Sequence, residues 1–132
     1  MRLGSTGNLV LAGTLSQASD RQIKQDFTAV NPQAVLDKVA ALSIQTWTYT
    51  NDVSRRHLGS VAQDFHAAFG LNGTDDKHIA TVDADGVALA AIQGLNQKVE
   101  VRSQRSENRI QKLEAENAEL LRRLEVIEAR LK

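Results

Sequence analysis

The chain has 132 residues, with 16 Lys and Arg, 16 Asp and Glu, three His and no Cys. This balanced charge argues against a polybasic nucleic-acid binder and against a basic membrane-surface protein. Without Cys there is no disulfide, no thiolate nucleophile and no cysteine-based zinc site. No apolar run approaches the roughly 18 residues of a membrane-spanning helix. We therefore expect no nucleic acid, membrane, metal or cofactor as a partner.

The residue types are unevenly distributed along the chain. All aromatic residues lie in the stretch 27–69, every Asp lies at or before Asp85, and every Glu lies at or after Glu100. After Gly94 there is no Gly, Pro or aromatic residue. Asp favours caps and turns, whereas Glu is a good helix former. The distribution predicts an α+β fold, with a small mixed domain followed by a long C-terminal helix.

Three parts are expected, with boundaries at residues 1–18, 19–84 and 85–132. The first part is small, polar and Gly-rich, and the alternation from Gly7 to Leu15 predicts a short strand. A single strand is not stable alone, so it must pair with the rest of the domain or with other chains. The N-terminal part is then either a fragment of a longer protein or a loose tail.

The first helix of the mixed domain is predicted to start at Asn31-Pro32, because Asn is a good N-cap and Pro suits the first helical position. The alternating β-branched and aromatic run 43–50 predicts a strand, and Asn51-Asp52 supplies a turn. Apolar residues of the helix recur at helical spacing, at Val35, Leu36, Val39 and Leu42.

A second strand is predicted at 57–59, followed by a helix that Ser60 caps and Gly70 ends. Residues 72–76 read as a loop, and 79–82 as a short extended segment. Such a short domain buries only about 60% of its surface and is marginal alone, so it is expected to need partners.

The long helix is predicted to begin near Gly86, capped by Asp83 or Asp85, and to end at Leu131, which gives a length of about 68 Å. Its last part carries apolar residues in alternating steps of three and four, which is a heptad pattern. Positions a and d of this heptad are Ile110, Leu113, Asn117, Leu120, Leu124, Ile127 and Leu131.

The heptad favours a parallel homotrimer. Arg109 and Arg123 at g face Glu114 and Glu128 at the following e positions of a neighbouring parallel chain, and both pairs attract. Leu121 widens the stripe, and Leu124 at a with Ile127 at d favours three or more strands, whereas Asn117 alone favours a dimer. A single solvated helix is the other alternative, but it leaves the apolar stripe unburied.

One run carries reactive residue types, from Ser19 through Asp20 to Lys24. A serine hydroxyl is a weak nucleophile until a base takes its proton. A lysine can be that base when burial makes its amine neutral. The separation suits an extended turn that brings the two side chains together. Ser and Lys are common on surfaces, so from the residues alone a catalytic role and a plain surface role both stay open.

The three histidines do not predict a metal site. His57, His66 and His78 are spaced unlike a helix-face pair, and no Cys or clustered Glu joins them. The segment 70–73 is predicted to be a turn, because no Lys-Ser or Lys-Thr follows its glycines as in a phosphate loop.

Four segments, in order, resemble the C-terminal intramolecular chaperone domain of phage endosialidases, tail spikes and tail fibres. The resemblance covers roughly residues 10–132 and ends in the coiled coil. The run Ala18-Ser19-Asp20-Arg21-Gln22-Ile23-Lys24 is similar to the signature that opens this domain. The other matching segments are 35–42 with Trp47-Thr48-Tyr49, then 57–65, then 82–95.

The resemblance implies a self-cleaving chaperone. Members of the family trimerise, hold three stalk chains in register while a β-rich trimer folds, and then cut themselves off. Carried over residue by residue, the cut falls between Ala18 and Ser19, Ser19 attacks the carbonyl of Ala18, and Lys24 is the general base. Asp20 and His57 match positions near the cut. The chain would then be a single-turnover serine endopeptidase without a cofactor.

The resemblance also implies partners and a place of action. The partners would be two further copies of the chain and its own N-terminal stalk, which residues 1–18 would end. The context would be the assembly of a phage tail fibre or spike, or a bacterial cell-surface protein, with the chaperone part released. A trimeric cap with a coiled coil that never cuts shares the same fold and is the alternative. A coiled-coil adaptor is a third class, but it leaves the Ser19 to Lys24 run unexplained.

Overall fold

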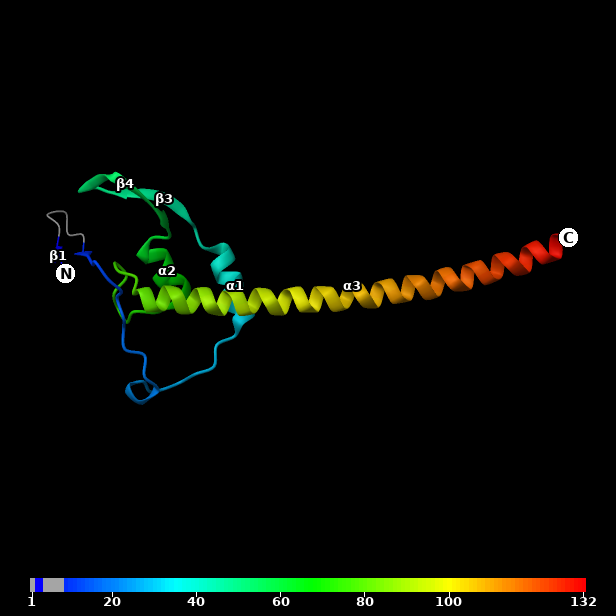
Figure 1. The fold of residues 1–132 in the computed structure, drawn as a ribbon, viewed down its shortest axis with the longest axis horizontal. Coiled ribbons are helices and arrows are strands. Elements are labelled where there is room, and N and C mark those ends of the chain that lie inside the picture. The colour runs from blue at the N-terminus through cyan, green and yellow to red at the C-terminus, as the bar shows by residue number, and fades with distance from the viewer. Residues whose placement is uncertain (1, 4–8) are drawn as a thin grey trace.

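The computed structural model describes residues 2–3 and 9–132 of the chain. One helix, α3, extends far beyond all other elements, which gather around its first turns (Figure 1). The predicted α+β class is confirmed: the described residues form two small antiparallel sheets of two strands each and a long C-terminal helix. The elements are β1 (Arg2–Leu3), β2 (Leu9–Val10), a 3-10 turn η1 (Arg21–Ile23), α1 (Pro32–Ala41), β3 (Gln45–Tyr49), β4 (Asp52–Gly59), α2 (Ala62–Phe69) and α3 (Thr81–Leu131).

The start of α1 is confirmed. The Asn31 side chain accepts hydrogen bonds from the backbone N–H groups of Gln33 and Ala34, at 3.0 and 3.2 Å, and Pro32 is the first helical residue. These are the orphan N–H groups that a helix start must satisfy, and the proline has none to lose. The local sequence therefore fixes where α1 begins.

Strands β3 and β4 form an antiparallel hairpin in which Trp47 pairs with His57 and Gln45 with Gly59. The predicted strand at 57–59 is only the end of β4, which begins at Asp52. Pairing with β3 extends the strand, because the polar residues of β4 gain ladder hydrogen bonds that the sequence pattern does not reveal. The register shifts between Trp47 and Tyr49.

The predicted cap of α2 was wrong, and its predicted end was right. Val61 is the N-cap and makes no side-chain hydrogen bond there, so Ser60 lies one residue too early to reach the first helical N–H groups. Gly70 ends the helix with φ 63°, a left-handed conformation that glycine adopts without a Cβ penalty. The loop at 72–76 is present as predicted.

The helix α3 starts earlier than predicted. The carbonyl of Ala80 already accepts from the N–H groups of Asp83 and Ala84, at 3.0 and 3.1 Å, so neither Asp83 nor Asp85 is the cap. Asp83 instead lies in the first turn, where a carboxylate favours the positive helix end. The extended segment predicted at 79–82 is therefore wrong in its second half. With 51 residues the helix is about 77 Å long.

The core lies where α1 packs against the first part of α3. Phe65 and Ala91 are buried, at 7% and 6% exposure, and Gly94 is buried as well. A Cβ added to Gly94 would lie 2.7 Å from the carbonyl carbon of Pro32 and 3.0 Å from Cβ of Leu36. The absence of a side chain at Gly94 thus lets the first turn of α1 touch the backbone of α3. From residue 95 onward every residue of α3 except Glu119 is exposed.

The N-terminal strand is shorter than predicted among the described residues. Leu9 and Val10 form β2 and pair with β1, while the predicted strand's first residues, Gly7 and Asn8, lie outside the described part of the chain. Residues 11–30 then run as an exposed arm that swings away from α3 on the side opposite the hairpin (Figure 1). Among the described residues, no helix is long and apolar enough to cross a membrane.

Candidate functional site

Ser19 and Lys24 come together at one turn of the arm. The Nζ of Lys24 donates a hydrogen bond of 2.6 Å to Oγ of Ser19. Between them the chain makes the 3-10 turn η1, closed by hydrogen bonds from Ile23 N–H to the Asp20 carbonyl and from Lys24 N–H to the Arg21 carbonyl, both 3.3 Å long. Ser19 lies just before this turn and Lys24 just after it, so one turn sets their separation. We refer to them as the Ser19–Lys24 pair.

The turn is held by contacts within the arm. Asp20 is its N-cap and accepts a hydrogen bond of 3.0 Å from Gln22 N–H. The guanidinium of Arg21 lies 5.2 Å from the centre of the Phe27 ring, within the range of a cation–π contact. Asp26 has φ 56°, a left-handed turn that Asp tolerates better than most residues. The residues around the pair thus order one another without help from α1, α3 or the hairpin.

The whole arm is exposed in the single chain. Ala18, Ser19 and Lys24 all lie on the surface. Large apolar side chains of the arm share this exposure, each above 60%: Leu15, Ile23, Phe27 and Val30. Apolar side chains gathered on an exposed segment indicate a surface that another element covers.

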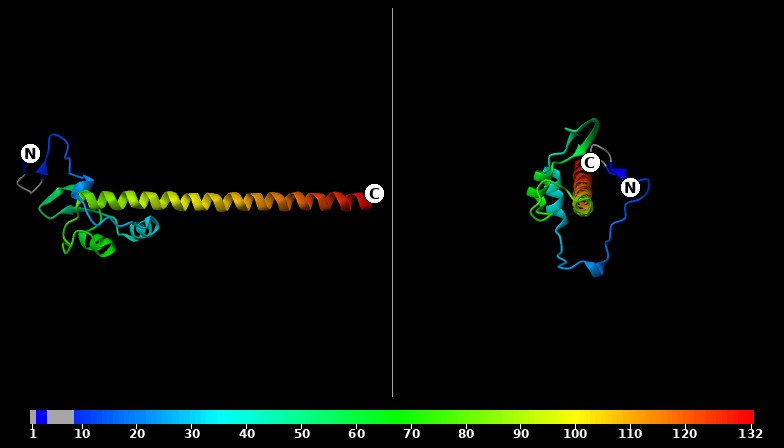
Figure 2. Two further views of the ribbon diagram at one scale, coloured as in Figure 1. Left: turned by 90° about the horizontal axis from the view of Figure 1, so that it is seen from below. Right: turned by 90° about the vertical axis from the view of Figure 1, so that its left-hand side faces the viewer.

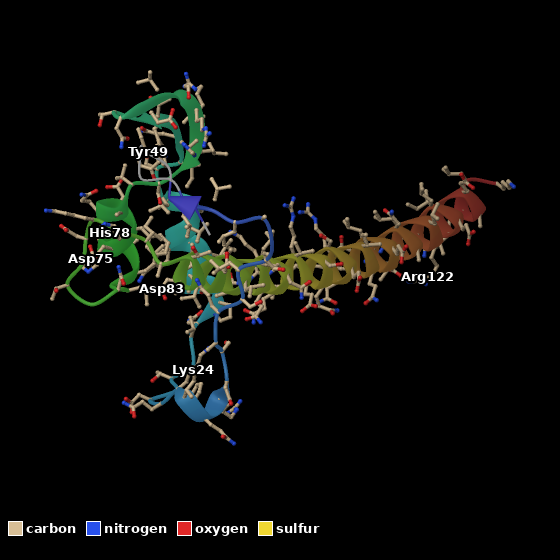
Figure 3. The ribbon with its side chains drawn as sticks, turned by 60° about the vertical axis from the view of Figure 1, so that its left-hand side comes forward. Lys24, Tyr49, Asp75, His78, Asp83 and Arg122 are labelled. Atoms are coloured by element: carbon tan, nitrogen blue, oxygen red, sulfur yellow. The ribbon has the colours of Figure 1, made fainter. Side chains whose placement is uncertain are left out.

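His57 does not join the Ser19–Lys24 pair in the single chain. Its ring stacks on Trp47, with centroids 4.8 Å apart, and meets Tyr49 edge-on at 5.3 Å. Tyr49 and Lys24 lie on opposite sides of α3, with the hairpin above and the arm below (Figure 3). His57 therefore belongs to an aromatic cluster of the hairpin.

The other two histidines order the loop before α3. Nε2 of His66 lies 2.9 Å from the Gly73 carbonyl, and Nδ1 of His78 lies 2.9 Å from Oδ2 of Asp75. The N–H group of Lys77, with further help from His78, holds the pKa of Asp75 below its ordinary value. Within the described residues, no group of three metal-ligating side chains occurs.

The heptad residues form an exposed stripe along α3. The apolar members of the stripe are between 47% and 82% exposed. The residues of α3 that the mixed domain covers fall at positions b, c and f of the same heptad frame, opposite the stripe. The views along and across the helix agree that α1 and α2 lie on one side of α3 (Figure 2). The covered residues are Asp83, Ala84, Val87, Ala90, Ala91 and Gly94.

Sequence reasoning missed two features of α3, an ion-pair cluster at Glu119 and a close helix contact at Gly94. In the single chain Arg122 and Arg123 both bind the Glu119 carboxylate at 2.9 Å, and these hydrogen bonds, that of Arg122 first, lower the pKa of Glu119. The spacing of three and four residues on a helix could have revealed this. The second missed feature is the close approach at Gly94, for which a glycine inside a helix was the available signal.

Residues 19–74 match a family model described as chaperone of endosialidase, whose family carries the name of a peptidase. The match begins at Ser19, the first residue of the pair just described. This segment is therefore similar to the chaperone-of-endosialidase family. The chaperone segment contains the η1 turn, α1, the hairpin, α2 and the start of the following loop. A comparison with curated proteins finds no match to the chain.

Proposed function

We propose that residues 19–132 form an intramolecular trimerisation chaperone that registers a β-rich stalk and then releases itself by cleavage before Ser19. The observation that carries the proposal is the hydrogen bond of 2.6 Å between Lys24 and Ser19, at the residue where the family match begins. In this proposal residues 1–18 end the stalk, 19–84 are the chaperone domain and 85–132 are the helix of a parallel coiled coil. The stalk belongs to a phage tail fibre or spike.

The cleavage chemistry follows from the pair. Neutral Lys24 takes the proton from Oγ of Ser19, and Oγ attacks the carbonyl carbon of Ala18. The C–N bond of the peptide then breaks, and the proton passes from Lys24 to the leaving nitrogen of Ser19. The product is an ester between Ala18 and the Ser19 side chain. Water hydrolyses this ester, which leaves a carboxylate on Ala18 and a free amine on Ser19.

The stripe on α3 supports assembly of the chaperone. Because the mixed domain covers only positions b, c and f, positions a and d stay available along the whole helix. Burying this apolar stripe between neighbouring helices supplies the driving force for association. Three g-to-e pairs attract in a parallel arrangement: Arg102 with Glu107, Arg109 with Glu114 and Arg123 with Glu128 of the next chain.

Assembly also supports the chemistry. An ammonium group cannot accept a proton, and burial favours the neutral amine of a lysine. Lys24 is exposed in the single chain, together with the apolar side chains of the same arm. Neighbouring chains that cover the arm would exclude water from the pair and favour the neutral form. Cleavage is therefore expected only after the trimer has formed.

The proposal is tested by following the chain on denaturing gels after purification, with sedimentation to determine its oligomeric state. The parent is expected to sediment as a trimer and to lose residues 1–18. Ser19→Ala, Lys24→Ala and Lys24→Arg are expected to stay uncut and trimeric, because Arg remains protonated and cannot act as the base. A trimeric parent that never cuts would favour the non-cleaving cap, and a monomer would refute the assembly.

A further inference from the structure

The Ser19–Lys24 contact depends on a single turn of backbone. The turn η1 has only three residues, and a 3-10 helix of this length contributes few hydrogen bonds of its own. Among the described residues no other element packs against it, since residues 11–30 are all exposed. A hydrogen-bond acceptor for the first N–H groups of this turn therefore contributes much of the stability of its conformation.

Asp20 is the residue that supplies this group. Its carboxylate accepts from Gln22 N–H at 3.0 Å, and its own carbonyl accepts from Ile23 N–H at 3.3 Å. Asp20 has extended backbone angles, φ −64° and ψ 137°, as an N-cap residue should. Its side chain and main chain thus accept from two N–H groups of the turn that separates Ser19 from Lys24, while the far end of the turn is closed by Lys24 N–H and the Arg21 carbonyl.

The geometry points to Asp20 as a positioning residue that holds Lys24 against Ser19 through the backbone, an inference that rests on the proposed cleavage for its function. An alternative role would be that of a third catalytic member acting through its charge. The structure favours positioning, because the carboxylate bonds to the backbone of Gln22. Asn is as good an N-cap as Asp, while Ala is a poor one. A positioning role is therefore retained by Asn and lost with Ala.

The first test measures the rate constant of self-cleavage in the full chain. Asp20→Ala is expected to slow it by about 2- to 30-fold, the range that corresponds to loss of a helix cap. Asp20→Asn is expected to cleave at a rate close to that of the parent and with an unchanged pH profile. A slow Asp20→Asn variant, or one whose pH profile is shifted, would mean that the negative charge itself acts, and would overturn the inference.

A second test does not need cleavage. The chain contains no Cys, so Ser19→Cys introduces one thiol whose alkylation by iodoacetamide can be followed by intact mass. An ammonium beside a thiol favours the reactive thiolate, and Lys24→Met in this background is expected to slow alkylation at neutral pH. Adding Asp20→Ala instead should slow it in the same way, while Asp20→Asn should not. If the parent never cuts but this pattern holds, the proposed cleavage fails and the positioning stands. Equal alkylation with Asp20→Ala and Asp20→Asn would refute the positioning.

Discussion

Replacing Gly94 by Ala should weaken the contact between α1 and α3. The added Cβ would lie 2.7 Å from the Pro32 carbonyl carbon and 3.0 Å from Cβ of Leu36, and closer still to the Pro32 carbonyl oxygen. Two of these three atoms belong to the backbone, at a proline whose φ is fixed. The Gln33 side chain also donates to the Gly94 carbonyl across the same contact. The two helices must therefore separate to admit one methyl group.

The expected size of the effect follows from two opposing contributions. Overpacking of this kind costs about 1–3 kcal/mol of unfolding free energy. Replacing a glycine inside a helix by Ala raises the free energy of unfolding by roughly 0.5–1 kcal/mol. Gly94→Ala is therefore expected to lower the free energy of unfolding by up to about 2.5 kcal/mol.

A matched control lies in the same helix. A Cβ added to Gly86 would have no atom within 4 Å. Gly86→Ala should therefore raise the free energy of unfolding by about 0.5–1 kcal/mol, through the higher helix propensity of Ala alone. Both variants are compared by urea denaturation in a Ser19→Ala chain, at one protein concentration because association stabilises the folded form. The two unfolding free energies should differ by about 1–3 kcal/mol. If Gly94→Ala stabilised the protein as much as Gly86→Ala, the described contact would be refuted.

Two further predictions concern assembly and acid stability. The double variant Leu120→Asp, Leu124→Asp should sediment as dissociated chains, because each unpaired buried carboxylate costs at least about 2 kcal/mol. As a control, Ala118→Asp at the outer b position should leave the trimer intact. A double variant that still sediments as a trimer would refute the stripe as the interface. The Lys77 N–H holds the pKa of Asp75 below its ordinary value of 3.8. The ionised carboxylate therefore stabilises the fold at pH values above 3.8, and this stabilisation is lost as the pH falls through the lowered pKa of Asp75. The melting temperatures of the parent and Asp75→Asn should therefore converge as the pH falls through this range, and a constant difference would contradict the stabilising role of that carboxylate.

Local sequence chemistry predicted the elements whose ends depend on neighbouring residues. Asn31 and Pro32 fixed the start of α1, and Gly70 fixed the end of α2, because a cap acts on N–H or carbonyl groups within one turn. The start of α3 at Thr81 was not predictable in this way, because no side chain caps it. The helix begins there while its first turns lie beside the mixed domain, and such tertiary contacts leave no local signal.

The candidate site was predicted in part. The spacing of Ser19 and Lys24 allowed the two side chains to meet, and the structure shows the turn that joins them. The sequence did not predict how far His57 lies from the Ser19–Lys24 pair, because a match to a family motif gives no distance between residues. In the structure His57 lies in the hairpin, stacked on Trp47. The heptad predicted the exposed stripe, whereas the trimer stays a prediction.

The most direct test of the account is the mass of the fragments that the purified parent yields on prolonged incubation, measured together with the intact Ser19→Ala chain. We expect two products: one that ends at Ala18 with a free carboxylate, and one that begins at Ser19 with a free amine. The Ser19→Ala chain should yield neither. A new N-terminus at any other residue, equal cleavage of Ser19→Ala, or an uncut parent would contradict self-cleavage by the Ser19–Lys24 pair.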